Sequence, residues 1–112
     1  MANTFKNSFT GSVGTTGVTA YTVGSSITAT TVIGLSVSNV SAANISVDVR
    51  AHDTAPTNKA IYLVKSALIP PGSNIVIVGG EQKLVLEAND TISVTSSAAT
   101  SADVAISVLE IS

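Results

Sequence analysis

Residues 33–51, IGLSVSNVSAANISVDVRA, decide the fold class. The first half alternates Ile33, Leu35 and Val37 with glycine and serine, and the second half alternates apolar with polar residues in the same way. A period of two places successive side chains on opposite faces of a β-strand. We therefore expect two strands, and the short Ser-Ala-Ala-Asn connection between them predicts an antiparallel hairpin.

Short apolar runs separated by turn residues continue on both sides of this stretch, and no segment has the period of an amphipathic helix. About eight short antiparallel strands at roughly ten-residue spacing predict an all-β fold, a β-sandwich or jelly-roll-like domain. We place this domain at residues 18–112. The two strands of the hairpin are expected at residues 27–40 and 45–51, and the others at residues 18–23, 60–68, 74–78, 83–86, 92–95 and 104–111.

Several details of this scheme are specific. The consecutive apolar residues Ile61 to Val64 predict a strand that is buried on both faces or packed under a neighbour. Pro70-Pro71-Gly72 predicts a sharp bend. The segment 87–90, Glu-Ala-Asn-Asp, predicts a hairpin turn, because Asn and Asp side chains bond to backbone groups in turns. Ile75 to Val78, if it forms an exposed edge, would need cover from another subunit.

Residues 1–17 are interpreted as an extended N-terminal arm. They are rich in Asn, Ser, Thr and Gly, which are poor helix formers, and they carry the chain's two phenylalanines, Phe5 and Phe9. Aromatic side chains contribute strongly at protein interfaces, so we expect these two to act as interface anchors. Residues 1–12 contain no apolar run of seven or more, so neither a secretory signal nor a membrane span is expected.

The composition favours a subunit of an assembly over a protein that is monomeric in solution. Charged residues make up 11% of the 112-residue chain, against about 25% in an ordinary soluble protein. The mean hydropathy is nevertheless +0.49, which indicates a large buried fraction, a large interface with a partner, or both, and we favour both. There is no cysteine, which excludes disulfides and thiol chemistry. A net charge of −2 with no basic cluster argues against nucleic acid as a partner.

Few side chains suit catalysis. His52 is the only histidine, with Asp53 beside it and Asp48 four positions earlier. One histidine cannot supply a zinc site of two or three histidines, and no G-x-S-x-G nucleophile motif is present. The segment 87–90 offers oxygen ligands for calcium, but its spacing is not that of a calcium loop and a turn explains it. We expect no enzyme activity, no metal site and no cofactor.

The C-terminal part of the chain resembles small β-rich structural proteins of tailed-bacteriophage virions. The resemblance covers roughly residues 30–112 and leaves the arm outside. It implies a hairpin-rich β-domain that is either a capsid decoration (cement) protein or a component of the neck or tail, with no catalytic residue. The segments that carry it are IYLVK at 61–65, IPPG at 69–72, GGEQKLVLEAND at 79–90, SSAA at 96–99, DV at 103–104 and VLE at 108–110.

The expected function is therefore structural. We expect a decoration protein that binds the outer shell as a homo-oligomer, with a trimer favoured, and that stabilises contacts between subunits of the major capsid protein. The expected location is the virion, after assembly in the host cytoplasm, with no nucleic-acid or membrane partner. A ring or fibre-anchoring protein of the neck or tail is the alternative. A host-surface carbohydrate-binding module is a third, weakened by the absence of tryptophan.

Overall fold

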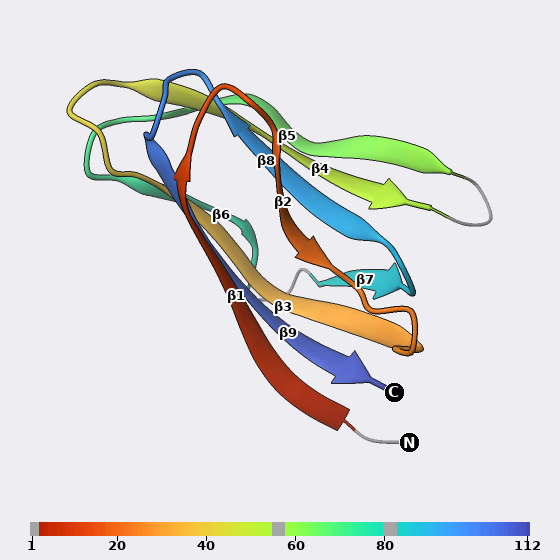
Figure 1. Ribbon diagram of the computed structural model, residues 1–112. Coiled ribbons are helices and arrows are strands. Elements are labelled where there is room, and N and C mark those ends of the chain that lie inside the picture. The colour runs from red at the N-terminus through yellow and green to blue at the C-terminus, as the bar shows by residue number, and fades with distance from the viewer. Residues whose placement is uncertain (1–2, 55–57, 80–82) are drawn as a thin grey trace.

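The structure is a computed structural model that describes residues 3–54, 58–79 and 83–112, and within them the chain forms a two-layer β-sandwich (Figure 1). The all-β class and the antiparallel pairing predicted from the sequence are confirmed. No helix in these ranges is long and apolar enough to cross a membrane. The strands are β1 (Asn3–Val13), β2 (Val18–Thr22), β3 (Ala29–Asn39), β4 (Ile45–Asp53), β5 (Lys59–Ile69), β6 (Asn74–Val78), β7 (Leu84–Glu87), β8 (Thr91–Ser96) and β9 (Ala102–Ile111).

The two sheets divide the strands in an order that differs from the order of the sequence. In the five-stranded sheet the strand order is β1-β9-β3-β6. β7 pairs with residues 29–32 of β3, and β6 pairs with residues 35–38 of the same strand. The four-stranded sheet runs β2-β8-β4-β5. The chain therefore crosses between the sheets repeatedly, as Figure 1 shows.

The core lies between the sheets and is built from every second residue of the central strands. In β9 the buried residues alternate with exposed ones from Ala102 to Val108. In β3 a bulge between Val32 and Gly34 shifts this alternation, so that Val32 is fully buried and Ile33 is not. The largest buried side chains of the core are Leu35, Ile45, Ile69, Ile92 and Ile106.

The hairpin predicted over residues 33–51 is wrong, because β3 and β4 belong to opposite sheets. Asn39, at the end of β3, is 1% exposed and its amide nitrogen donates to the carbonyls of Ala43 (2.7 Å) and Ile69 (2.9 Å). Its side-chain oxygen accepts hydrogen bonds from the backbone N–H (2.8 Å) and the hydroxyl (2.7 Å) of Ser41. These bonds turn the connection across the core, so β3 and β4 face each other instead of pairing.

The hairpin predicted around residues 87–90 is also wrong, although the turn itself is confirmed. β7 pairs with β3 and β8 pairs with β2 and β4, so the turn links the two sheets. The Asp90 carboxylate accepts the N–H of Glu87 (2.8 Å) and that of Thr54 (3.1 Å), and the N–H of Asp90 donates to the carbonyl of Glu87 (3.0 Å). Asn89 adopts a positive φ of 71°, which asparagine tolerates well in turns.

Burial of the 60–68 strand on both faces is wrong as well. β5 is the edge of the four-stranded sheet, and Ile61, Tyr62 and Leu68 are exposed. The bend at Pro70-Pro71-Gly72 is confirmed: the N–H of Ser73 donates to the carbonyl of Pro70 (3.1 Å), and Gly72 has a φ of 72° that favours glycine. β6 does lie at an edge of the five-stranded sheet, and Val76 is exposed.

The residues interpreted as an arm are part of the sheet. β1 pairs with β9 from Asn3 to Thr10 in regular antiparallel register and closes one side of the five-stranded sheet. Val13, at its end, is fully buried in the core. The strand forms because residues Asn3 to Thr10 alternate outward and inward side chains, and β9 offers a free edge along its whole length.

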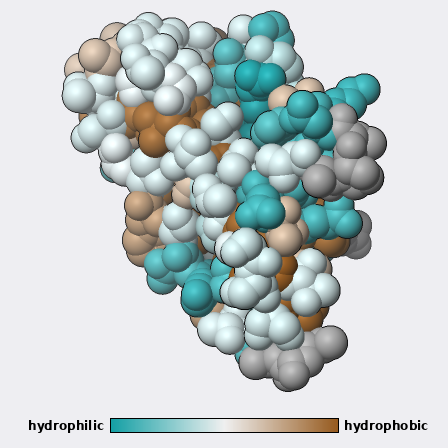
Figure 2. All heavy atoms as spheres, turned by 45° about the vertical axis from the view of Figure 1, so that its right-hand side comes forward, coloured by the Kyte–Doolittle hydropathy of each residue, from teal (hydrophilic) through white to brown (hydrophobic). Residues whose placement is uncertain are grey.

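Hydroxyl and other small residues take the place of charge on the surface. Figure 2 shows one face of the molecule, on which residues of intermediate hydropathy predominate and hydrophobic side chains emerge in small separate areas. This agrees with a chain in which only 11% of residues are charged. Serine and threonine therefore cover much of the sandwich where Lys, Arg, Asp and Glu would cover an ordinary domain.

Candidate functional site

The outer face of the five-stranded sheet carries two rows of residues that run across its strands. One row begins at Phe5 on β1 and the other at Phe9, because residues four apart in a strand point to the same side. Each row continues through directly opposed partners on β9, β3 and then β7 or β6. We define the apolar face by these two rows: Phe5, Leu109, Thr31 and Val85 in the first, and Phe9, Ala105, Ser36 and Val76 in the second.

The ends of both rows are open to solvent. Phe5 is 75% exposed, Phe9 73%, Val76 67% and Val85 64%. A phenylalanine presents about 150–250 Å², so the two rings alone expose on the order of 300 Å². The largest apolar patch of a typical monomer measures about 300–600 Å² and is often functional. Asn7 of β1 and Ser107 of β9 separate the two rows, so the apolar face is a candidate docking surface made of two parallel apolar rows with polar residues between them.

Charge on this face is confined to its ends. Among the strands of this sheet, the outward-facing charged side chains are Asp103, near one end of β9, and Glu87, at the last residue of β7. Asp103 is partly engaged, because its Oδ1 accepts the backbone N–H of Ser12 (3.1 Å). A partner that covered the centre of the face would have no charge to desolvate there, which favours close packing.

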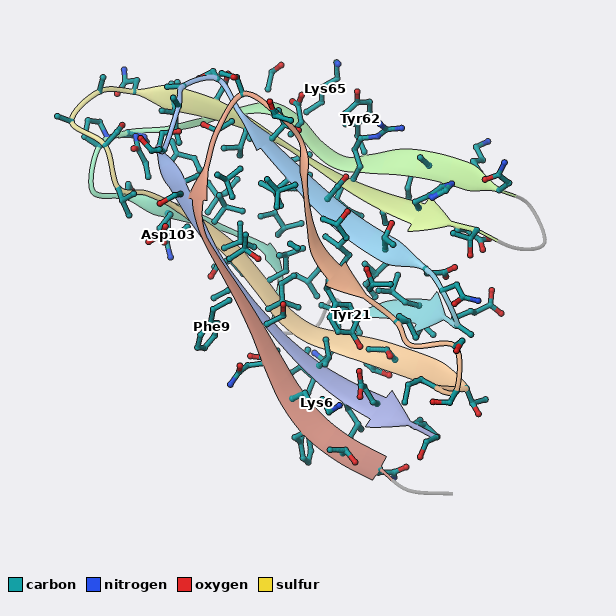
Figure 3. All side chains as sticks on the ribbon, in the orientation of Figure 1. Lys6, Phe9, Tyr21, Tyr62, Lys65 and Asp103 are labelled. Carbon is teal, nitrogen blue, oxygen red and sulfur yellow. The ribbon has the colours of Figure 1, made fainter. Side chains whose placement is uncertain are left out.

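The sequence identified only the β1 end of this face. Phe5 and Phe9, predicted as anchors, lie on the same side of β1 with Asn7 between them, and both are exposed, as Figure 3 shows for Phe9. The strand partners Leu109, Val85 and Val76 were missed as site residues, although the alternation in β9 could have placed Ala105 and Leu109 on the outward side. What the sequence could not supply is the register that aligns them with the two phenylalanines.

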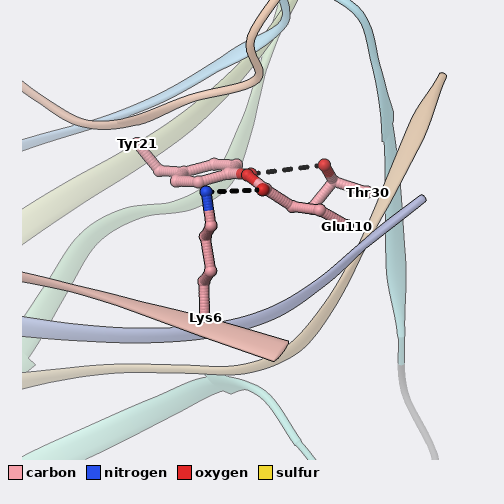
Figure 4. A network of polar contacts seen from close by, with 4 residues as sticks. All are labelled: Lys6, Tyr21, Thr30 and Glu110. Carbon is pink, nitrogen blue, oxygen red and sulfur yellow. Dashed lines mark hydrogen bonds and ion pairs between the residues drawn. The ribbon is translucent and has the colours of Figure 1, made fainter. Parts of the chain in front are cut away.

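A partly buried polar network fastens β1 to the sandwich beneath the apolar face (Figure 4). The Lys6 ammonium lies 3.1 Å from Oε1 of Glu110, whose side chain is 8% exposed. The Tyr21 hydroxyl donates to Oε2 of Glu110 (2.5 Å) and lies 3.2 Å from the Thr30 hydroxyl. The network thus joins β1, β9, β2 and β3, and it fixes the strand that carries Phe5.

The same contacts shift two pKa values in opposite directions. The hydrogen bond from Tyr21, together with Lys6, lowers the pKa of Glu110 from its ordinary value of 4.5, and outweighs the desolvation that opposes it. Burial and the hydrogen bond to Glu110 raise the pKa of Tyr21 from 10.0 to about 12. The folded state therefore favours an ionised Glu110 and a neutral Tyr21.

Stability is consequently expected to fall at both ends of the pH scale. A lowered carboxyl pKa contributes stability above pH 4.5 that is lost as the pH falls through the folded-state value. A raised phenol pKa contributes stability below pH 10 that is lost as the pH rises from 10 towards 12.

We expect Tyr21→Phe to reduce the fall of the melting temperature above pH 10, when melting temperatures are measured from pH 3 to 12. Tyr62→Phe, which removes the same hydroxyl from an exposed ring, is the control; equal effects of both variants would contradict this assignment.

The histidine and carboxylates that the sequence placed near one another serve separate local bonds. His52 Nε2 lies 3.0 Å from Oδ1 of Asn58, across the connection between β4 and β5. Asp48 Oδ1 accepts the backbone N–H of Ser66 (2.6 Å), a residue with a positive φ of 53°. These bonds shape the edge of the four-stranded sheet.

A group of carboxylates does converge beside a pocket of about 410 Å³ between the sheets' ends. Asp53, Glu87 and Asp90 place one oxygen each within 4.8 Å of one another. The sequence had grouped Glu87 and Asp90 with Asn89 and had not included Asp53. One Asp90 oxygen accepts the N–H of Glu87 within the turn and the other accepts the N–H of Thr54 after β4, so the buried member of the group ties the turn to the end of β4.

Tyr62 is the exposed aromatic side chain of the four-stranded sheet. The Arg50 guanidinium carbon lies 5.2 Å from its ring centroid and the Lys65 ammonium lies 4.5 Å from it, both within cation–π range. Figure 3 shows Tyr62 and Lys65 together on β5, away from the core. Tyr21 is turned into the Glu110 network. Of the two tyrosines, only Tyr62 is therefore exposed, with two cations beside its ring.

No protein-family model matches the sequence, and no curated protein matches it either. The fold is similar to that of a chain from the Bacillus endospore appendages, described as a family of disulfide-linked pili. The TM-score is 0.60 at 12% identity, over 98% of this chain and 89% of that one. It is also similar to a chain of the T13 particle of the virus IBDV, with a TM-score of 0.60 at 11% identity. A chain of the Gx strain of infectious bursal disease virus gives 0.53 at 13%.

The two viral alignments cover 97% of this chain but only 31% and 30% of the viral chains. The viral proteins thus contain this sandwich as about one third of a longer chain. At identities of 11–13% these likenesses establish a shared β-sandwich architecture.

Proposed function

We propose that this protein is a structural virion component, a capsid decoration protein that binds the outer shell as a homo-oligomer and stabilises contacts between capsid subunits. The observation that carries the proposal is the apolar face. The sandwich seals its own core between two sheets, so this second apolar surface, which is free of charge at its centre, is left for another protein chain.

The solved structures with a similar fold support a role in an assembly. Two belong to particles of an icosahedral virus and one to a pilus, and both kinds of object are built from many copies of protein chains. The pili are described as disulfide-linked. This chain has no cysteine, so its own contacts must be held by packing and hydrogen bonds.

The mechanism is additive burial. Each copy that covers its apolar face gains about 25 cal/mol for every Å² of apolar surface removed from water. A closed symmetric shell repeats that gain at every equivalent position, so a small contribution per copy stabilises the whole particle. No catalytic step is part of this proposal, because the polar side chains described above stabilise turns, edges and the fastening of β1.

The copy number per particle tests the proposal. We expect quantitative mass spectrometry of purified virions to find this chain at an abundance close to that of the major capsid protein. A few to a few dozen copies would instead place it in the neck or tail, as the alternative from the sequence has it, and the decoration proposal would then be wrong. Absence from purified particles would remove the virion role altogether.

A further inference from the structure

β1 is the long, regular edge of the sandwich. It pairs with β9 and with no other strand in the described ranges, and Figure 1 shows it on the outside of its sheet. The edge strands β2, β6 and β7 have only five, five and four residues. β5 has eleven residues, but its pairing with β4 is interrupted by register shifts and it carries Lys59 and Lys65. Short length, bulges and lysine are the features that keep edge strands from pairing with other chains.

β1 has little of this protection. Its pairing with β9 is regular from Asn3 to Thr10, and the irregularity falls only after Thr10. The strand contains no proline. Its single charge, Lys6, is directed to Glu110 on the inner side, and Ser8 donates its hydroxyl hydrogen to the carbonyl of Ala20 (2.6 Å) on that side too. The outward side and the free edge remain available.

The regular part of β1 also reads nearly the same in both directions. Residues 4–10 are Thr-Phe-Lys-Asn-Ser-Phe-Thr, which is symmetric about Asn7 except at Lys6 and Ser8. Two antiparallel copies centred on Asn7 would set each Phe5 opposite Phe9 of the second copy. Lys6 would meet a serine, so no like charges would face one another. Directly opposed aromatic residues stabilise antiparallel pairs.

We propose that two copies of this chain pair through their β1 edges, antiparallel and centred on Asn7, to form one continuous sheet. The outward side chains of both copies then lie on the same side of that sheet. The row from Val85 through Leu109 to Phe5 continues into Phe9 of the second copy and on to its Val76. The pairing thus joins two apolar faces into one surface twice as wide.

This inference specifies a contact between copies and rests on the proposed function, which requires a homo-oligomer. A two-fold contact uses the same residues on both sides and closes at a pair. The trimer favoured by the sequence would need a contact between different surfaces. Both alternatives can be distinguished in solution, without any particle, so the inference and the virion role can fail separately.

A single introduced cysteine tests the register directly, since the native chain has none. At Asn7 the two Cβ atoms would lie about 4.5–5.5 Å apart, within reach of a disulfide or a short bismaleimide. At Asn3, another asparagine on the same side of the same strand, they would lie about 27 Å apart, at about 3.4 Å per residue. We expect Asn7→Cys to give mostly covalent dimer and Asn3→Cys to give at least tenfold less.

Sedimentation of the unmodified chain completes the test. We expect a species of twice the 11.2 kDa chain mass at micromolar concentration. Equal cross-linking of the two cysteine variants, or a trimer in which Asn7→Cys does not cross-link, would overturn the pairing. A protein that stays monomeric in solution and still occupies virions at high copy number would overturn this inference and the homo-oligomer of the proposed function, and would leave its binding to the capsid in place.

Discussion

Asn39→Ala is expected to lower the free energy of unfolding by about 2–4 kcal/mol, more than any other single change of a polar residue considered above. The substitution leaves the carbonyls of Ala43 and Ile69 without the amide that now donates to them. A buried polar group without a partner costs about 1–3 kcal/mol, and Asn39 is 1% exposed, so water cannot replace the amide without opening the core. Urea unfolding followed by circular dichroism measures the difference.

Ser41→Ala is the matched control. It removes the hydroxyl that bonds to Asn39 but leaves the Asn39 amide nitrogen in place, in a more exposed part of the connection. We expect a loss of about 0.5–1 kcal/mol, the value of an ordinary hydrogen bond. Equal losses for both variants would mean that the connection between β3 and β4 is held by the backbone and not by Asn39.

The failure of the two predicted hairpins has a common physical reason. Alternation of apolar and polar residues indicates which side chains of a strand face the core, and that prediction held for residues 45–51 of β4 and for Leu35 and Val37 of β3, while the bulge in β3 moved Ile33 out of the pattern. It does not state which strand lies alongside. A short polar connection can close a hairpin or cross to the opposite sheet. In this protein both connections cross, and the buried side chains of Asn39 and Asp90 bond to the connecting backbone at Ala43 and Glu87.

The candidate site was predictable to a similar degree. Phe5 and Phe9 are large apolar residues in a segment of hydroxyl and amide side chains, so the composition of that segment was enough to single them out. Val85 and Val76 were hidden because β7 and β6 carry apolar residues on both faces, and Leu109 was hidden because only its pairing with Phe5 places it in the row. Exposure at an edge depends on strand order, and β5, with its run from Ile61 to Val64, shows how a hydrophobic run becomes an exposed edge strand.

The largest functional effect is expected from Phe5→Asp combined with Phe9→Asp, which should reduce occupancy of virions at least tenfold. Covering a phenylalanine contributes about 1.5–3 kcal/mol, and about 1.4 kcal/mol corresponds to a tenfold change in binding. Two lost aromatic contacts and two carboxylates left against an apolar partner therefore exceed that bound. Deleting residues 2–12 is a poorer test, since it would also remove the strand that pairs with β9.

The double variant should still fold, because both rings are about three-quarters exposed and contribute little to the core. An unchanged circular dichroism spectrum and a melting temperature within a few degrees check this. Leu68→Asp makes the same kind of change at a 63% exposed residue of the four-stranded sheet, and it should rebind to particles lacking the protein as well as the native chain does. The opposite result, in which Leu68→Asp loses occupancy and the phenylalanine variant keeps it, would contradict this prediction. It would show that the particle contacts the four-stranded sheet and that the apolar face is turned away from the shell.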